Sequence, residues 1–279
     1  MEAVISWATR EKMGDMKDNE NYRAGLLLVN LGTPDSPSTR DVRRYLKEFL
    51  EDPRVVEMPR ILWWPILNGV ILNVRPRRSA KAYRKIWSGE GSPLLVHTLN
   101  QAEALQEAVG DEVKVVAAMR YGNPSIAIGL KQLREAGCNR ILVFPLYPQY
   151  SATTTASAFD AVTAELRNWR WIPELRLVNQ YGHDHGYLEA LASSVREYQQ
   201  THGTPQKLLF SFHGIPQRYA DRGDPYPLQC SDTAQRLAGK LQLEAEQWQL
   251  TYQSRMGREP WLQPYTSATL EELARAGIK

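Results

Sequence analysis

Short apolar runs alternate with longer amphipathic stretches along this chain. The apolar runs are bounded by turn residues, which is typical of buried strands, and the amphipathic stretches have helical spacing. Strands and helices that alternate in this way predict βαβ crossovers and doubly wound parallel sheets. We expect strands at 25–31, 113–119, 140–147, 175–178, 207–212 and 248–253, and helices near 39–52, 95–109, 124–136, 155–168, 186–200, 228–242 and 267–276.

The pattern divides the chain into two halves of similar design. An aliphatic run that leads into a Gly-x-Pro turn occurs at 25–34 and again at 208–216. We expect a polar N-terminal extension at 1–23, an N-terminal α/β lobe at 24–170 and a C-terminal α/β lobe at 171–279, which the strand at 175–178 opens. No buried strand follows the last helix, so we expect the second lobe to be truncated and the sequence to be a fragment.

The most apolar window of the chain is 61–74, within a longer segment, 53–74. The window has 14 residues, which is too short to cross a bilayer. Two interpretations stay open: a core segment, or a mobile apolar lip over a pocket for a large flat ligand, touching the membrane surface. The basic run 75–78 that follows suits a solvated face, or a place where carboxylates or anionic lipid head groups bind.

Composition excludes several classes of protein. The net charge is +3, from 34 basic and 31 acidic residues, so no strong electrostatic footprint for nucleic acid is present. The two cysteines, Cys138 and Cys230, have no paired spacing, which argues against a disulfide framework and against a clustered zinc or iron–sulfur site. Residues 1–23 lack a long apolar stretch and are therefore not read as a secretory signal. A cytoplasmic protein is expected.

Candidate functional residues lie where the predicted strands end. His213 follows the strand at 207–212, and the carboxyl end of a parallel strand is where α/β sheets bind ligands. An imidazole there suits a metal ligand or a proton acceptor, although a core histidine with one satisfied nitrogen is an equally fair interpretation. Arg120-Tyr121 and the segment 147–151 end two other strands, which indicates either a pocket rim or surface packing.

A set of motifs in one order resembles the ferrochelatases, the enzymes that insert ferrous iron into protoporphyrin IX, and most closely those of bacteria. The resemblance runs from about Gly25 to Lys279. Its seven motifs are Leu-Gly-Thr-Pro at 31–34, Gly-Ser-Pro-Leu at 91–94, Arg120-Tyr121, Tyr-Pro-Gln-Tyr-Ser at 147–151, Ser-Phe-His-Gly-Ile-Pro at 211–216, Gly-Asp-Pro-Tyr-Pro at 223–227, and Gln-Ser-Arg at 253–255 with Glu-Pro-Trp-Leu at 259–262.

The resemblance implies a fold and a function. The fold would be two similar Rossmann-like lobes with parallel four-stranded sheets and a porphyrin cleft between them. The function would be a lyase that completes haem biosynthesis, with protoporphyrin IX and Fe²⁺ as its only small-molecule partners, no further cofactor and no iron–sulfur cluster. We expect a monomer that binds no nucleic acid, and peripheral contact with a membrane stays open.

The same resemblance assigns roles to individual residues. His213 would take a pyrrole proton, bind iron, or do both. A flat apolar macrocycle with two propionates needs aromatic walls and a polar edge. Tyr147, Tyr150, Trp261 and the segment 62–70 suit the walls, and Ser92, Arg120 and Tyr121 suit the edge.

One departure from the family bears on activity. Ferrochelatases continue beyond this point with a strand and a glutamate opposite the active-site histidine, and neither is present in this sequence. Without that carboxylate, His213 is expected to bind Fe²⁺ weakly. The alternatives left open are therefore a non-catalytic porphyrin- or haem-binding module and a related tetrapyrrole chelatase for cobalt or nickel.

Overall fold

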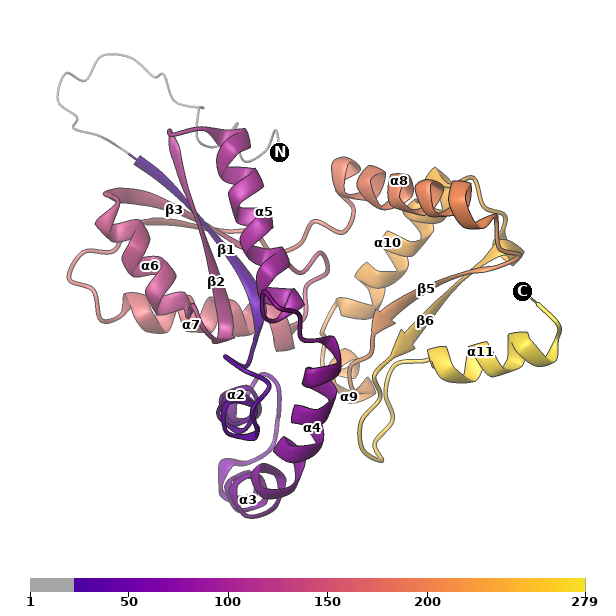
Figure 1. Cartoon of the computed structure of the whole chain (residues 1–279), viewed down its shortest axis with the longest axis horizontal. Coiled ribbons are helices and arrows are strands. Elements are labelled where there is room, and N and C mark those ends of the chain that lie inside the picture. The colour runs from indigo at the N-terminus through magenta and orange to yellow at the C-terminus, as the bar shows by residue number, and fades with distance from the viewer. Residues whose placement is uncertain (1–22, 279) are drawn as a thin grey trace. The chain divides into compact units, whose positions relative to one another are not determined.

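The structure is a computed structural model that describes residues 23–278 (Figure 1). The fold is α/β, and its contacts divide it into two units. The first unit comprises residues 23–147 and 152–179, and the second comprises residues 148–151 and 180–278. The chain thus passes into the second unit at residues 148–151 and returns to the first unit at residue 152.

A four-stranded sheet of parallel strands forms the centre of the first unit. The strand order is β2-β1-β3-β4. The strands are β1 (Arg23–Thr33), β2 (Val113–Gly122), β3 (Cys138–Pro145) and β4 (Glu174–Leu177). Because β1 has a partner on both sides and helices on both faces, it reads as an almost continuous aliphatic run, as central parallel strands do.

Helices cover both faces of this sheet, and alternate residues of β1 point to opposite faces. Leu27 and Val29 pack with α6 (Ile126–Glu135) and α7 (Ser157–Leu166) on one face. Leu26 and Leu28 pack with α5 (Pro93–Val109) on the other. The helices predicted near 95–109, 124–136 and 155–168 are therefore confirmed, and they form the layers that the strand and helix alternation predicted.

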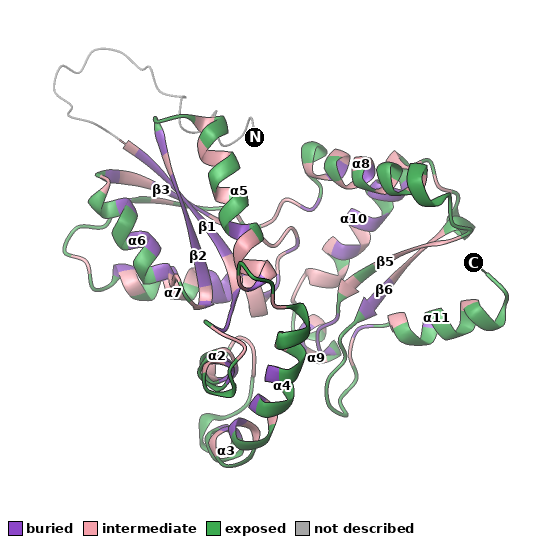
Figure 2. Cartoon of the chain, in the orientation of Figure 1, coloured by how far each residue is buried: buried purple, intermediate pink, exposed green. Residues whose placement is uncertain are grey.

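The apolar window at 61–74 is an interrupted helix with one buried face and one exposed face (Figure 2). It consists of α3 (Arg60–Ile66), a π-helical turn (Leu67–Ile71) and the start of α4 (Leu72–Ile86). The buried face packs against α2 (Thr39–Glu51) through Trp63, Leu67 and Leu72. The Trp63 indole N–H donates to the Leu50 carbonyl at 2.7 Å. The core interpretation therefore describes the packed face, and the mobile lip over a pocket stays a prediction.

The opposite face of this helical segment is apolar yet exposed. Its large exposed side chains are Ile61, Leu62, Trp64, Ile66, Val70 and Val74. An exposed face of this kind normally marks a binding surface. No helix within residues 23–278 is long and apolar enough to cross a membrane.

The second unit contains a parallel two-stranded sheet rather than the four-stranded sheet that we expected. Its elements are α8 (His185–His202), β5 (Leu208–His213), α9 (Gln217–Asp221), α10 (Tyr226–Lys240), a 3₁₀ turn (Ala245–Gln247), β6 (Trp248–Gln253) and α11 (Thr266–Arg275). The strand expected to open this lobe is β4, and it belongs to the first sheet instead. Arg140 to Val143 of β3 pair with Glu174 to Leu177, which satisfies the exposed edge of β3.

The close packing of α6 on the first sheet gives a test of this fold. A Cβ atom at Gly129 of α6 would lie 2.7 Å from Leu27 Cδ1 and 3.1 Å from Ala118 Cβ. We expect Gly129→Ala to lower the free energy of unfolding by about 1–3 kcal/mol, since overpacking outweighs the better helix propensity of alanine. Urea denaturation measures the change.

Gly239 of α10 is the matched control because no atom lies within 4 Å of the position of its Cβ. Gly239→Ala should leave stability unchanged or raise it by up to about 1 kcal/mol. Equal effects of the two substitutions would contradict the packing described here.

Candidate functional site

His213 is the last residue of β5, and a backbone hydrogen bond holds the chain just beyond it. His213 pairs with Gln253 of β6, and the Gly214 N–H donates to the Gln253 carbonyl at 2.8 Å. The imidazole Nδ1 lies 2.7 Å from the Gly214 carbonyl oxygen. Because a carbonyl oxygen can only accept, Nδ1 carries the proton of the neutral ring. Nε2 therefore keeps its lone pair, as a base or a metal ligand requires.

Gly214 allows the strand end to fit against its neighbours. A Cβ atom there would lie 3.1 Å from the Gln253 carbonyl oxygen and 3.3 Å from Trp261 Cε3. The ring of Trp261 lies 6.4 Å from that of His213, centroid to centroid. Trp261 also forms a backbone bridge to Pro216, and the Leu262 N–H donates to the Ile215 carbonyl at 3.0 Å. The turn after His213 is thus held by the segment that carries Trp261.

The segment 148–151 places Tyr150 in the same unit as His213 and Trp261. The Tyr150 N–H donates to Gln229 Oε1 at 2.7 Å. The Gln149 side chain donates to the Thr233 hydroxyl at 3.0 Å, and the Ser151 hydroxyl donates to Asp224 at 2.8 Å. Three separate contacts to α10 and to the turn before it therefore hold the segment, so the position of Tyr150 is determined by the second unit.

Ser92 and Tyr147 belong to the first unit. Ser92 is the N-cap of α5 and only 4% exposed, yet its hydroxyl does not cap the helix and has no partner among residues 23–278. A helix N-terminus with a hydroxyl to spare suits an anionic group. Tyr147 follows β3, which ends at Pro145, and its side chain is half-buried.

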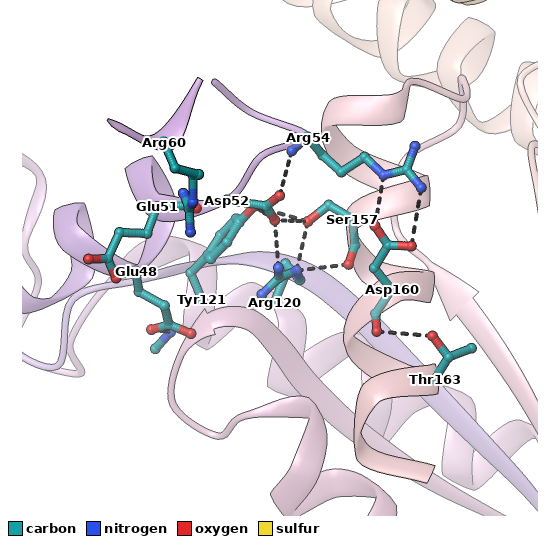
Figure 3. Close-up of polar contacts among 11 residues, drawn as sticks. Glu48, Glu51, Asp52, Arg54, Arg60, Arg120, Tyr121, Ser157, Asp160 and Thr163 are labelled. Carbon is teal, nitrogen blue, oxygen red and sulfur yellow. Dashed lines mark hydrogen bonds and ion pairs between the residues drawn. The ribbon is translucent and has the colours of Figure 1, made fainter. Parts of the chain in front are cut away.

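The polar groups at the end of β2 form a buried cluster with Asp52, the C-cap of α2 (Figure 3). We call Asp52, Arg120, Tyr121 and Ser157 the Asp52 cluster. Asp52 Oδ2 accepts hydrogen bonds from Arg120 Nη2 at 2.5 Å, the Tyr121 hydroxyl at 2.8 Å and the Ser157 hydroxyl at 2.6 Å. Tyr121 is fully buried, so its hydroxyl serves the cluster.

Electrostatics keep Asp52 ionised despite its burial. Burial by itself raises the pKa of Asp52, but the hydrogen bonds from Ser157, Tyr121 and the Arg54 N–H, together with the charge of Arg120, outweigh it and lower the pKa. Burial raises the pKa of Tyr121 and keeps its hydroxyl protonated as a donor. The cluster is therefore a buried ion pair with a full set of donors.

His213 belongs to no cluster of metal ligands in the described part of the chain. Within residues 23–278, no three His, Cys, Asp or Glu side chains lie close enough to hold a metal ion together. The described part of the chain thus contains no preformed cage for a metal ion.

Sequence reasoning missed Asp52 and Ser157. Asp52 was interpreted only as the end of a helix, because Pro follows it. Ser157 lies inside an apolar stretch that predicts a helix and nothing more. A buried aspartate at a helix end close to an arginine at a strand end is visible only after the chain has folded.

The lowered pKa of Asp52 predicts a pH dependence of stability. An aspartate in an unfolded chain has a pKa of about 3.9. Since the folded pKa is lower, the stabilisation from ionised Asp52 is complete well above pH 4 and is lost as the pH falls through the folded pKa. The free energy of unfolding should therefore fall more steeply between pH 5 and pH 3 in the wild type than in Asp52→Asn. At pH 7, Asp52→Asn should cost about 3 kcal/mol. Parallel pH profiles in urea denaturation would contradict this prediction.

Comparison with known proteins places the chain in a family. The sequence model of the ferrochelatase family matches residues 23–279. The chain is 58% identical over 253 residues to the ferrochelatase of Thioalkalivibrio sulfidiphilus, an alignment that covers 89% of this chain and 69% of that protein. It is 57% identical over 260 residues to the ferrochelatase of Aromatoleum aromaticum, with 91% and 71% covered. It is 55% identical over 257 residues to that of Methylococcus capsulatus, with 92% and 78% covered. A match along almost the whole described chain, at identities above one half, shows that this chain belongs to the ferrochelatase family.

Proposed function

We propose that His213 is the residue at which the chemistry of this ferrochelatase takes place, the insertion of iron into protoporphyrin IX in haem biosynthesis. The hydrogen bond from Nδ1–H to the Gly214 carbonyl carries the proposal, because it leaves the lone pair on Nε2. His213 is exposed, so a proton accepted there can pass on to water.

The reaction needs a base and a route for the metal. Iron replaces two protons on the pyrrole nitrogens, so two protons leave for each ion that enters. Nε2 of His213 can accept one of these protons, can bind Fe²⁺ on its way to the macrocycle, or can do both in turn. Fe²⁺ and the porphyrin are the substrates, and this chemistry requires no organic cofactor.

The porphyrin would need aromatic side chains against its ring and polar side chains near its carboxylates. Trp261, Tyr150 and Tyr147 would supply apolar contacts to the ring. Ser92 would donate its unpartnered hydroxyl to a carboxylate, and Arg120 has one guanidinium nitrogen, Nη1, that donates no hydrogen bond within residues 23–278. Tyr121 would contribute indirectly, through Asp52.

A second candidate function is porphyrin or haem binding without metal insertion. The lack of a metal-ligand group around His213 within residues 23–278 favours it, because an imidazole alone binds Fe²⁺ weakly. A chelatase releases metallated porphyrin repeatedly, whereas a binding module does not. A chelatase for cobalt or nickel would differ from one for iron in the metal that it inserts fastest. Cytoplasmic location and a monomeric state stay predictions.

Metal insertion into a soluble porphyrin, followed by absorbance with Fe²⁺ and separately with Co²⁺ and Ni²⁺, tests the role of His213. We expect the chain to insert Fe²⁺, and His213→Ala to lower kcat by about 10²–10⁴-fold, the usual contribution of a positioned base. Porphyrin affinity, measured by fluorescence quenching, should change little.

His202→Ala is the matched control, since His202 is an exposed histidine of α8 that bonds to the Tyr198 carbonyl and stacks on the Tyr198 ring. It should behave as the wild type. A wild-type chain that binds porphyrin but inserts no metal would support the binding module instead. Equal kcat for His213→Ala and the wild type would disprove the role of His213.

We further propose that the exposed apolar face of α3 and α4 contacts an apolar surface, that of the porphyrin or of a membrane. Six large apolar side chains are exposed along one side of this helical segment, while its other side is fully packed. The arginines of α4 that follow lie where anionic groups of either ligand would be attracted.

Leu62 tests this contact because it is 60% exposed. Leu62→Gln should leave the free energy of unfolding within about 0.5 kcal/mol of the wild type, as is usual for exposed positions. If the face binds porphyrin, the KM for porphyrin should rise severalfold. If it binds lipid, co-sedimentation with phosphatidylglycerol vesicles should fall. If both the KM for porphyrin and the co-sedimentation stay unchanged, the contact is ruled out.

A further inference from the structure

Asp52 lies where α2 ends and the segment to α3 begins. Its side chain is 3% exposed, and it is an ionised carboxylate in a place where a charge is costly. Such a charge persists only when hydrogen bonds replace its water, and four donors do so here. They come from the end of β2, from the start of α7 and from the Arg54 N–H, so the carboxylate connects three separate parts of the first unit.

The cluster uses two of the three guanidinium nitrogens of Arg120. Nε donates to the Ser157 carbonyl at 2.9 Å and to its hydroxyl at 2.7 Å, and Nη2 donates to Asp52. Nη1 donates no hydrogen bond within residues 23–278, and the Glu48 carboxylate is the other charge that acts on this guanidinium. Because the guanidinium is a rigid plane, the two nitrogens that are held determine where the third one points.

The other carboxylate oxygen of Asp52 organises the chain that follows. Oδ1 accepts from the Arg54 N–H at 2.7 Å, and the Asp52 carbonyl accepts from the Val55 and Val56 N–H groups at 3.1 and 3.0 Å. The Arg54 side chain binds Asp160 of α7, as Figure 3 shows. The carboxylate thus holds the first turn of the segment leading to α3 through the Arg54 N–H alone, and the backbone carbonyl of Asp52 holds the next two residues.

We propose that Asp52 is a positioning residue for porphyrin binding, which aims Arg120 Nη1 at an anionic group of the substrate. The inference rests on the proposed function. Asp52 itself contacts no substrate, because its carboxylate is buried and its oxygens are occupied. Its effect is transmitted through Arg120, and the effect should therefore appear in porphyrin binding and not in the chemistry at His213.

A double-mutant cycle separates this role from a general loss of stability. The variants are Asp52→Asn, Arg120→Leu and the two combined, and the measurements are KM and kcat for porphyrin together with porphyrin affinity from fluorescence quenching. We expect Asp52→Asn to raise KM about tenfold, the change that follows from losing one oriented charge-assisted contact, and to leave kcat nearly unchanged. The double variant should have the KM of Arg120→Leu alone.

Asp232→Asn is the matched control. It also removes an aspartate that binds an arginine, Arg236 of α10, but this pair is exposed, and exposed pairs contribute little. Its KM should equal that of the wild type. Ser157→Ala is a milder second variant, for the case in which Asp52→Asn does not fold, since it removes one donor to Asp52 and one acceptor of Arg120. It should raise KM severalfold.

Three results would overturn the proposal: an unchanged KM in Asp52→Asn or in Ser157→Ala, a KM increase that adds to that of Arg120→Leu, or a fall in kcat with KM constant. A wild-type chain that binds no porphyrin would overturn the proposed function as well. A wild-type chain that binds porphyrin, together with an Asp52→Asn variant that binds it equally well, would refute this inference alone.

Discussion

The close approach of two parallel strands at their carboxyl ends is the constraint on which both units depend. At Gly32, where φ is +114°, any Cβ atom would collide with the Tyr121 carbonyl oxygen. At the end of β5 the approach is milder, because a Cβ atom at Gly214 would lie 3.1 Å from the Gln253 carbonyl oxygen. A side chain at Gly32 would push β1 and β2 apart, and one at Gly214 would force a smaller shift of β6.

The two units repeat one arrangement around this constraint. In the first unit the Met119 N–H donates to the Pro124 carbonyl, and in the second the Tyr252 N–H donates to the Pro264 carbonyl. The strand pairing that goes with these bonds aligns Leu-Gly-Thr-Pro at 31–34 with His-Gly-Ile-Pro at 213–216. His213 therefore occupies the place that Leu31 has in the first unit. The proposed function therefore rests on one imidazole that takes the place of an aliphatic side chain.

In the first unit, the strand that supplies polar side chains to the Asp52 cluster is β2 and not β1. There the end of β2 provides Arg120 and Tyr121, and a buried carboxylate from α2 gathers them with Ser157 of α7. A buried charge of this kind contributes little net stability, because its desolvation offsets most of the attraction. What it does contribute is a single geometry, since any rearrangement would leave the charge without donors. A single geometry is what the role proposed for Arg120 in porphyrin binding requires.

The sequence by itself determined the α/β class, most of the helices and strands, the ferrochelatase family and the position of His213 at a strand end. These features depend on local periodicity and on motifs, which the order of residues carries directly. Only the tertiary structure decided that the strand at 174–177 joins the first sheet, that the window at 61–74 has one packed and one exposed face, and that Asp52 binds Arg120. These features depend on which surfaces meet in the fold: the partner of a strand, the side that a helix buries, and a contact between residues 68 positions apart. Local sequence does not encode which surfaces will meet.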